Sequence, residues 1–442
     1  MDAAFAEDVI KKAMKKGCDA AEVFLKNSRG ISVEAKDGKV EALEASRDFG
    51  IALKIIKQQK LGFSFTTSPE EIEKTIDEAV QSAEWTGADE YTDIPELMEY
   101  SDVLNLDENI KKIKEEKIIS DAILLEDSAL SLDNRVKRVR KAEVNSATGN
   151  TVIANSKGVS ISYESSYYSA HVTTLAQDDA GDSQMGWDYA GSRRLADIDL
   201  KSVGEKAANS AIELLGSRKI SPVKAPVILS PSVAVDFLDI LSKSLSAESV
   251  QKHRSFLVGK INQEIVSPIV DIIDDGTIPW GTGTSPVDDE GVPVRNKTLI
   301  SAGILKGFIH NTYTAKKEGT VSTGNAVRGS SKGLAGIDAT NLYLKADKGS
   351  SDNGLIKSLS KGALILGAMG IHTANPVSGD FSIGISGLWI ENGEAVYPFK
   401  EAVISGNILD MFKRVEATGN DLTFYGNTGS PSLLIGEMDI SA

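Results

Sequence analysis

The sequence predicts an α+β protein, in which two helix–strands–helix units precede a sheet-rich C-terminal domain. Two observations lead to this prediction. In the first half of the chain, segments with helical spacing of apolar residues flank strand-like segments. Beyond residue 226 the composition shifts to Gly, Ser, Thr and β-branched residues, with turn dipeptides at Asp275-Gly276, Asn392-Gly393 and Gly406-Asn407. Many short strands separated by such turns are typical of a sheet-rich domain, for which a barrel is one arrangement.

The first unit begins with a helix that ends at Gly17, and strands follow it. Apolar residues recur at helical spacing at Phe5, Val9, Ile10 and Ala13. Strand-like runs then cover residues 22–26, 31–35, 50–56 and 61–65. Asp37-Gly38 predicts a hairpin turn between two of these strands. Ser68 and Glu71, with Pro69 between them, predict a capping box at the start of a second helix, which ends near Gly87.

The second unit repeats this order after a polar link at residues 89–102. We expect a helix over residues 107–126, strands from 136 to 189, and another helix over 200–215. Residues 61–65 and 185–189 share a pattern, and each segment precedes a helix. The match indicates an internal duplication, although so short a match also arises by chance.

Prolines at residues 222 and 226 mark the boundary to the C-terminal domain. An early helix over residues 232–245 is expected there, with Val233, Phe237, Leu238, Leu241 and Leu245 on its apolar face. The predicted domains are therefore residues 1–100, 101–218 and 219–442.

The composition of the chain excludes several classes of function. The chain has 442 residues and a net charge of −15, which repels phosphate backbones and anionic membranes. Cys18 is its single cysteine, so intramolecular disulfides and thiolate zinc sites are excluded. The N-terminus lacks the pattern of a signal peptide, and no apolar run is long enough to span a bilayer. We therefore expect a cytoplasmic protein that binds neither nucleic acid nor membrane.

No familiar catalytic motif is evident from residue spacing. The histidines nearest to each other in sequence, His253 and His310, are 57 residues apart, so no helical pair of metal ligands exists. The acidic pairs Asp274/Asp275 and Asp288/Asp289 have the residue types of a Ca²⁺ site or of an acid and a base. Strand-ending turns explain these pairs more simply, because Asp is common in turns.

One segment resembles a known family. Residues 370–387, Gly-Ile-His-Thr-Ala-Asn-Pro-Val-Ser-Gly-Asp-Phe-Ser-Ile-Gly-Ile-Ser-Gly, resemble the C-terminal signature of the TldD/PmbA peptidase family. Further blocks that carry the resemblance are residues 273–277, 288–293, 303–308 and 322–328. The resemblance implies a cytosolic peptidase role. It also implies the family's label, modulator of DNA gyrase, which nothing in this sequence supports physically.

The resemblance also implies that the zinc-binding motif is degenerate. Catalytic members carry His-Glu-x-x-x-His on a helix, and the alignment of residues 245–261 fixes its register here. Leu238 and Lys243 then replace the two histidines, and Asp239 replaces the glutamate. The family's third ligand is a cysteine, and the corresponding segment 424–429 has none. We expect no metal and no catalytic residue in this chain, and zinc in a partner subunit.

Five polar residues are candidate contacts to a peptide substrate. Asn325 and Arg328 lie in a Gly/Ser-rich segment, and His372, Asn375 and Ser378 lie in the signature segment. Such side chains are suited to bind a peptide backbone or carboxylate. A structural role in a turn is an equal alternative for each.

Three functions remain open. The first is a PmbA (TldE)-type subunit that forms a heterodimer with a zinc-bearing TldD-type chain and degrades or processes unfolded peptides. The second is a hydrolase that is active alone through an unrecognised site. The third is a non-enzymatic homodimer that binds peptides.

Overall fold

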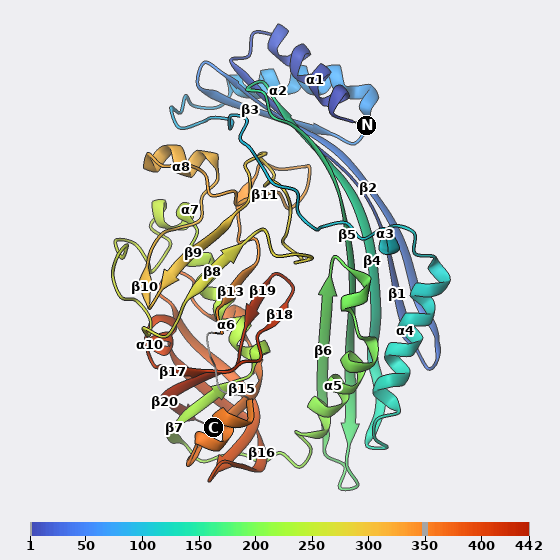
Figure 1. Ribbon diagram of the computed structural model, residues 1–442, viewed down its shortest axis with the longest axis vertical. Coiled ribbons are helices and arrows are strands. Elements are labelled where there is room, and N and C mark those ends of the chain that lie inside the picture. Colours follow the sequence, from blue (N-terminus) through green and yellow to red (C-terminus); the bar gives the residue numbers. More distant parts are fainter. Residues whose placement is uncertain (1, 347–351, 442) are drawn as a thin grey trace.

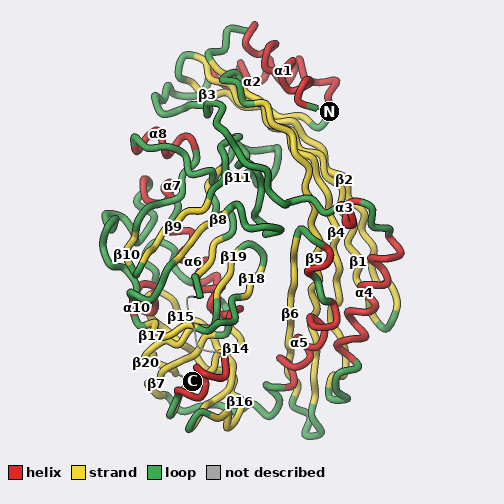
Figure 2. Tube along the Cα trace, in the orientation of Figure 1, coloured by secondary structure: helices red, strands yellow, loops and turns green. Residues whose placement is uncertain are grey.

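The computed structural model describes residues 2–346 and 352–441. A long, curved antiparallel sheet carries helices on one face, and the C-terminal domain lies against the other face (Figure 1). Figure 2 shows the same division, with long strands on one side and short strands and loops on the other. The α+β class predicted from the sequence is confirmed. Among the described residues, no helix is long and apolar enough to cross a membrane.

The first unit contains α1 (Ala3–Lys15), β1 (Ala20–Lys36), β2 (Lys39–Lys57), β3 (Lys60–Thr66) and α2 (Ile72–Glu84). Asp37 and Gly38 form the predicted hairpin turn, with φ of 53° and 71°. The two strands expected at 22–26 and 31–35 are one continuous strand, β1, because antiparallel neighbours on both sides pair with it along this length.

The predicted capping box at Ser68 is wrong. Residues Pro69–Glu71 form a 3-10 turn before α2, and Ser68 makes no capping hydrogen bond. The Ser68 hydroxyl donates instead to the Glu70 carboxylate at 2.5 Å. The Ser68 N–H, which a capping box directs to the Glu71 carboxylate, donates instead to the Thr66 hydroxyl at 3.0 Å.

The second unit contains α3 (Glu108–Lys111), α4 (Glu115–Leu130), β4 (Val136–Asn155), β5 (Ser160–Gln177), β6 (Ser183–Ser192) and α5 (Leu200–Ile212). The single helix expected over 107–126 is two helices. Lys114 adopts an extended conformation between them, with φ of −94° and ψ of 152°. Ile110 of α3 and Ile118 of α4 are both buried against the sheet.

Both units share one sheet of strand order β3-β2-β1-β4-β5-β6, in which β1 pairs with β4 at the centre. The strands therefore follow the same order outward in each half. Side chains alternate between the faces of a strand, so Val23 and Leu25 pack under the helices, as do Val33 and Ala35 farther along β1. The residues between them, such as Phe24, face the C-terminal domain.

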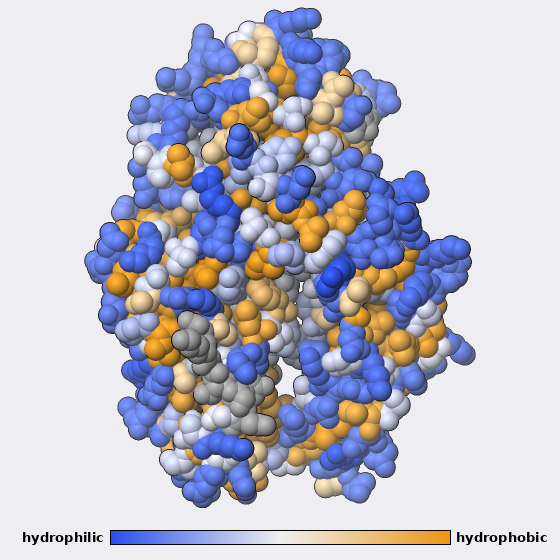
Figure 3. All heavy atoms as spheres, viewed as in Figure 1, coloured by the Kyte–Doolittle hydropathy of each residue, from blue (hydrophilic) through white to orange (hydrophobic). Residues whose placement is uncertain are grey.

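The C-terminal domain combines a barrel with a second sheet. Strands β7, β14, β15, β16 and β20 form the barrel, which is closed by pairing of Val403 with Ser441 and of Ile404 with Ile440. The barrel-like arrangement is therefore confirmed. A mixed sheet of order β10-β9-β8-β13-β19-β18 lies beside it. Figure 3 shows openings between this domain and the lower part of the N-terminal sheet.

The bounds of the C-terminal elements are β7 (Val223–Leu229), α6 (Pro231–Ser244), α7 (Ala247–Gln251), β8 (Ile272–Asp275), β9 (Asn296–Ser301), β10 (Ile304–Leu305), α8 (Thr312–Glu318), β11 (Ala326–Val327), β12 (Gly336–Ile337), β13 (Leu342–Leu344), α9 (Asp352–Ser358), β14 (Lys361–Met369), β15 (Asp380–Glu391), β16 (Glu394–Asn407), α10 (Ile408–Lys413), β17 (Val415–Thr418), β18 (Thr423–Tyr425), β19 (Thr428–Ser430) and β20 (Leu433–Ser441). The helix predicted at 232–245 corresponds to α6.

Candidate functional site

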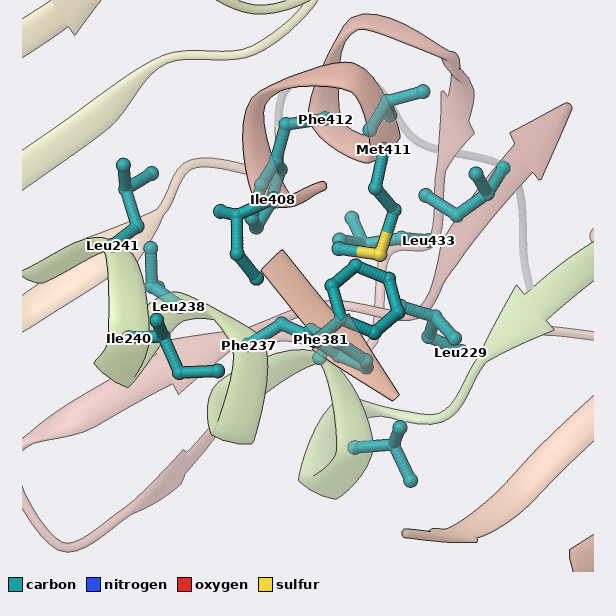
Figure 4. Packing of buried hydrophobic residues seen from close by; sticks show 14 of the residues in the cluster. Leu229, Phe237, Leu238, Ile240, Leu241, Phe381, Ile408, Met411, Phe412 and Leu433 are labelled. Carbon is teal, nitrogen blue, oxygen red and sulfur yellow. The ribbon is translucent and has the colours of Figure 1, made fainter. Parts of the chain in front are cut away.

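Helix α6 carries the degenerate zinc motif, and its two sides differ in chemistry. Leu238 is 1% exposed and lies among apolar side chains of α6, α10 and the barrel (Figure 4). Phe237 beside it packs edge-on against Phe381. Asp239 and Lys243, four residues apart, share the opposite, exposed side of the helix. The first histidine position of the motif is therefore part of the hydrophobic core.

A hydrogen bond connects α6 to the segment that would supply the family's third ligand. The Thr428 hydroxyl on β19 donates to Asp239 Oδ1 at 2.6 Å. Although the residue as a whole is exposed, its carboxyl group lies against β19, and this partial burial raises the pKa of Asp239, an effect that the Thr428 hydrogen bond and the charge of Lys243 offset in part. Asp236, one turn earlier, has its pKa raised to about 6 by burial and by the charge of Asp239. Helix α6 and strand β19, which correspond to the family's zinc-binding helix and its third-ligand segment, are thus in contact.

The side chains at these positions do not fit a zinc ion. Leu238 has no donor atom, Lys243 is a cation, and only Asp239 is a ligand type. A zinc ion coordinated by one carboxylate next to an ammonium group would lack the three protein ligands that are usual for catalytic sites. Among residues 2–346 and 352–441, no group of three or more His, Cys, Asp or Glu side chains is arranged to hold a metal.

Asn325 is buried in a structural network. Its amide nitrogen donates to Asp274 Oδ2 at 2.8 Å and to the Asp338 carbonyl at 2.9 Å. Its amide oxygen accepts from the Thr323 hydroxyl at 2.8 Å, and Lys297 forms an ion pair with Asp274 at 2.9 Å. The amide of Asn325 is thus occupied by protein groups, and a contact to peptide stays a prediction.

Arg328 connects the C-terminal domain to the N-terminal sheet. Its guanidinium donates to Glu22 Oε1 at 2.7 Å and to the Gly333 carbonyl at 2.8 Å. Glu290 lies 3.4 Å from Lys54, which is itself 3.9 Å from Glu22. All four side chains are at most 9% exposed. We call Glu22, Lys54, Glu290 and Arg328 the charge quartet.

The charge quartet contains two cations and two carboxylates, and its two glutamates lie in different environments. Burial raises the pKa of Glu22, and the charges of Lys54 and Arg328 offset this only in part. One oxygen of Glu22, Oε2, has no hydrogen-bond partner among the described residues. For Glu290, Lys54 and the N–H of Thr312 outweigh burial and leave its pKa lowered. The two parts of the chain also pack closely at Gly50 on β2, opposite Lys26 of β1, where a Cβ would lie 1.8 Å from Ser331 Oγ.

His372, Asn375 and Ser378 lie in the exposed turn between β14 and β15. Asn375 Oδ1 accepts from the backbone N–H of Val377 at 2.8 Å and of Ser378 at 3.2 Å. The Ser378 hydroxyl donates to Asp380. Within the described part of the chain, no hydrogen bond or ion pair joins these three residues to Asn325 or Arg328. Binding of peptide at this turn stays a prediction.

One residue of each acidic pair has the turn role predicted for it. Asp288 Oδ1 accepts from the backbone N–H of Glu290 and Val292, at 3.0 and 2.9 Å. Its second oxygen accepts from Ala326 N–H at 2.9 Å. Asp275 likewise closes a turn by accepting from Thr277 N–H at 2.8 Å. The turn interpretation therefore holds for Asp288 and Asp275, whereas Asp289 accepts from Arg328 N–H and Asp274 from Thr340 N–H, which joins segments distant in sequence.

Aromatic side chains line the face of β5 and β6 that points toward the C-terminal domain. Trp187 packs edge-on against Tyr425 of β18, with ring centroids 5.7 Å apart, and lies 6.4 Å from His171. The hydroxyls of Tyr167 and Tyr189 are hydrogen-bonded to each other on the same face. Sequence reasoning missed this surface, because its members alternate with helix-facing residues and form no contiguous motif. The surface is suited to contact an extended, partly apolar peptide.

Comparison with known proteins gives full-length matches. The family profiles for the PmbA/TldA metallopeptidase domains match residues 21–83 (domain 1), 108–215 (central domain) and 222–442 (C-terminal domain). A metalloprotease PmbA homolog of Buchnera aphidicola is 31% identical over 432 residues, covering 96% of this chain and 93% of that protein. Metalloprotease PmbA of Escherichia coli O157:H7 is 30% identical over 429 residues, covering 96% and 92%.

Solved structures agree with these matches. A Thermotoga maritima protein described as a modulator of a DNA gyrase superposes with a TM-score of 0.92 at 29% identity, covering 99% of each chain. TldE of Thermococcus kodakarensis has a TM-score of 0.91 at 22% identity, covering 99% of this chain and 100% of that one, which shows a shared fold. Three domain profiles in order and relatives that match nearly end to end show that this chain belongs to the PmbA/TldD family of metallopeptidases.

Proposed function

We propose that this chain is the PmbA (TldE)-type, metal-free subunit of a cytoplasmic TldD/TldE-type metalloprotease that degrades or processes unfolded peptides. The observation that carries the proposal is the chemistry of α6. Leu238 and Lys243 stand where the family's zinc ligands would be, and Leu238 belongs to the core. A chain of this family with no zinc donor set needs another chain to supply the metal, and a TldD-type protein is suited to do so.

In this proposal the chain contributes binding surface rather than catalytic groups. The aromatic face of β5 and β6, with Trp187 and Tyr425, is suited to one wall of an enclosure for an extended peptide. Main-chain groups at strand edges would add affinity that is independent of side-chain sequence, as unfolded substrates require. The exposed side of α6, with Asp239 and Lys243, would face the same space without taking part in metal chemistry.

The test is proteolysis of an unfolded protein substrate by this chain alone, by a TldD-type partner alone and by their mixture, with zinc measured in each preparation. We expect cleavage only in the mixture, zinc only in the partner, and co-elution of the two chains. Cleavage by this chain alone would instead establish a hydrolase with a different site. Peptide binding by a homodimer, with no gain on mixing, would establish a non-enzymatic binding protein.

A further inference from the structure

A polar cavity of about 420 Å³ lies between the N-terminal sheet and the C-terminal domain. Lys26 of β1, Thr151 of β4, Tyr163 and Ser165 of β5, and Arg193 after β6 line it on one side. The opposite wall consists of C-terminal loops around residues 282–289, 324–327, 338–340 and 426–427. Its volume falls within the range of small-ligand pockets. The cavity exists only where the two parts of the chain meet.

Arg193 is held rigidly in this cavity without an anionic partner. Its guanidinium donates to the carbonyl oxygens of Gly281, Ser166 and Thr282, at 3.0, 3.2 and 2.7 Å. A guanidinium has five N–H donors, so two remain without a protein acceptor among the described residues. No carboxylate of the described chain lies within ion-pair distance of it. Burial lowers the pKa of Arg193, but an arginine stays charged at neutral pH.

Lys26 is the second cation of the cavity, and it is also free of an ion pair. It lies on β1 four residues after Glu22, so alternation places both side chains on the sheet face toward the C-terminal domain. Its ammonium makes no hydrogen bond or ion pair with any described residue, although its charge lowers the pKa of Asp289, which burial raises. Lys54 and Arg328 on the same interface are neutralised by Glu22 and Glu290.

Three carboxylates, those of Asp288, Asp289 and Asp338, also line the cavity, and backbone N–H groups bind most of their oxygens, including Asp338 Oδ1, which accepts from Ala339 N–H at 2.8 Å. Both oxygens of Asp288 are occupied by backbone N–H groups, and Asp289 Oδ2 accepts from Arg328 N–H at 2.6 Å. Burial, followed by the charge of Asp289, raises the pKa of Tyr163, so its hydroxyl stays neutral and can donate. Asp338 on the far wall is the other carboxylate of the lining. Two unpaired cations and a phenol therefore face the interior, in a chain whose net charge is −15.

We propose that this cavity binds the terminal carboxylate of a peptide, with Arg193 and Lys26 contacting the two carboxylate oxygens. The geometry suits a carboxylate, because an arginine held in a fixed plane with two free N–H donors recognises that group directionally. The proposal rests on the proposed function, since it makes the free C-terminal end of a peptide the part that this subunit holds. A free amino acid carries the same group, and the experiment separates these two sources.

The experiment is isothermal titration calorimetry on the full-length chain with acetyl-Ala-Ala-Ala as the free acid, with its C-terminal amide, and with free alanine. We expect the acid to bind at least about tenfold more tightly than the amide, since a charge-assisted hydrogen bond is lost. We expect free alanine to bind more weakly than the acid. Equal affinity for acid and amide would overturn the proposal, and equal or tighter binding of alanine would overturn the assignment to peptides.

Substitution of Lys26 tests whether the peptide acid binds in this cavity. Lys26→Met is expected to weaken binding of the acid about tenfold without affecting the amide, while Lys39→Met, an exposed lysine of β2 outside the lining, leaves both unchanged. Unchanged acid binding in Lys26→Met would overturn the proposed site. The comparison of acid and amide uses the unaltered chain, so it stays decisive if a variant fails to fold. Failure of the proposed function is seen separately, as absence of cleavage in the mixture with a TldD-type partner.

Discussion

The charge quartet and the polar cavity lined by Lys26 and Arg193 lie at the same interface, yet their cations are used differently. In the quartet, Arg328 and Lys54 lie opposite Glu22 and Glu290, and all four groups are buried. In the cavity, Lys26 and Arg193 have no carboxylate within ion-pair distance among the described residues. The quartet is therefore an internal contact between the domains, whereas the cavity retains cationic groups that a ligand can occupy. Pairing, rather than charge alone, separates a structural role from a binding role.

The largest expected effect comes from removing one member of the quartet. Arg328→Met leaves Glu22 buried beside only Lys54, at 3.9 Å, so we expect a loss of about 3–5 kcal/mol in the free energy of unfolding. Urea denaturation measures it. The double variant Glu22→Gln/Arg328→Met should recover part of the loss, because it removes the uncompensated charge. A loss below about 1 kcal/mol in Arg328→Met would contradict a structural role for the quartet.

A buried carboxylate without a paired cation provides the intermediate case. Asp188 of β6 is 8% exposed, and burial raises its pKa to about 6. Its ordinary pKa of 3.8 applies in the unfolded chain, so the contribution of Asp188 to stability should fall as pH rises from about 4 to about 6 and then level off.

Asp188→Asn removes this titration. We expect the variant to be more stable than the wild type by about 2–3 kcal/mol at pH 7, and by little at pH 4. Denaturation curves at both pH values measure the difference. Lys206 is the cation whose charge partly offsets the shift, and Tyr189 N–H does the same by hydrogen bonding. A variant whose advantage is equal at both pH values would show that ionisation of Asp188 is not the cause.

The effect of Lys26→Met on the free energy of unfolding also tests the role of the cavity. Because Lys26 has no ion pair to lose, we expect the free energy of unfolding to change by less than about 1 kcal/mol. The same denaturation assay as for Arg328→Met gives a direct contrast between a paired and an unpaired cation. A loss as large as that of Arg328→Met would assign Lys26 to the structural network and remove the basis for the contrast.

The smallest effect concerns the exposed side of α6. Burial and the charge of Asp239 raise the pKa of Asp236 to about 6. Asp239→Asn keeps a polar group beside Thr428 but removes that charge, so the pKa of Asp236 should fall by a fraction of a unit. Carboxyl carbon chemical shifts followed by NMR across the titration measure it, with Lys243→Met as the matched change on the same side. An unchanged pKa would show that the two carboxylates do not interact.

Much of the fold was predictable because its signals are local. Asp37-Gly38 specifies a hairpin turn, and the apolar spacing of residues 233–245 specifies α6, with Leu238 on the buried side. The continuous strand β1 and the break between α3 and α4 were not predictable, because both depend on neighbours supplied by distant parts of the chain. The capping box at Ser68 failed for a local reason, since the Ser68 N–H donates to the Thr66 hydroxyl two residues earlier.

The sequence by itself determined the chemistry of the degenerate motif, since Leu238, Asp239 and Lys243 fix its donor atoms whatever the fold. It also determined, through the alternation of β1, that Glu22 and Lys26 share a face. Only the tertiary structure decided that Glu22 meets Arg328, 306 residues away, while Lys26 forms no ion pair with any described residue. The physical reason is that ion pairing depends on distances of a few ångströms, which are set by how the C-terminal domain docks on the sheet and not by any local pattern.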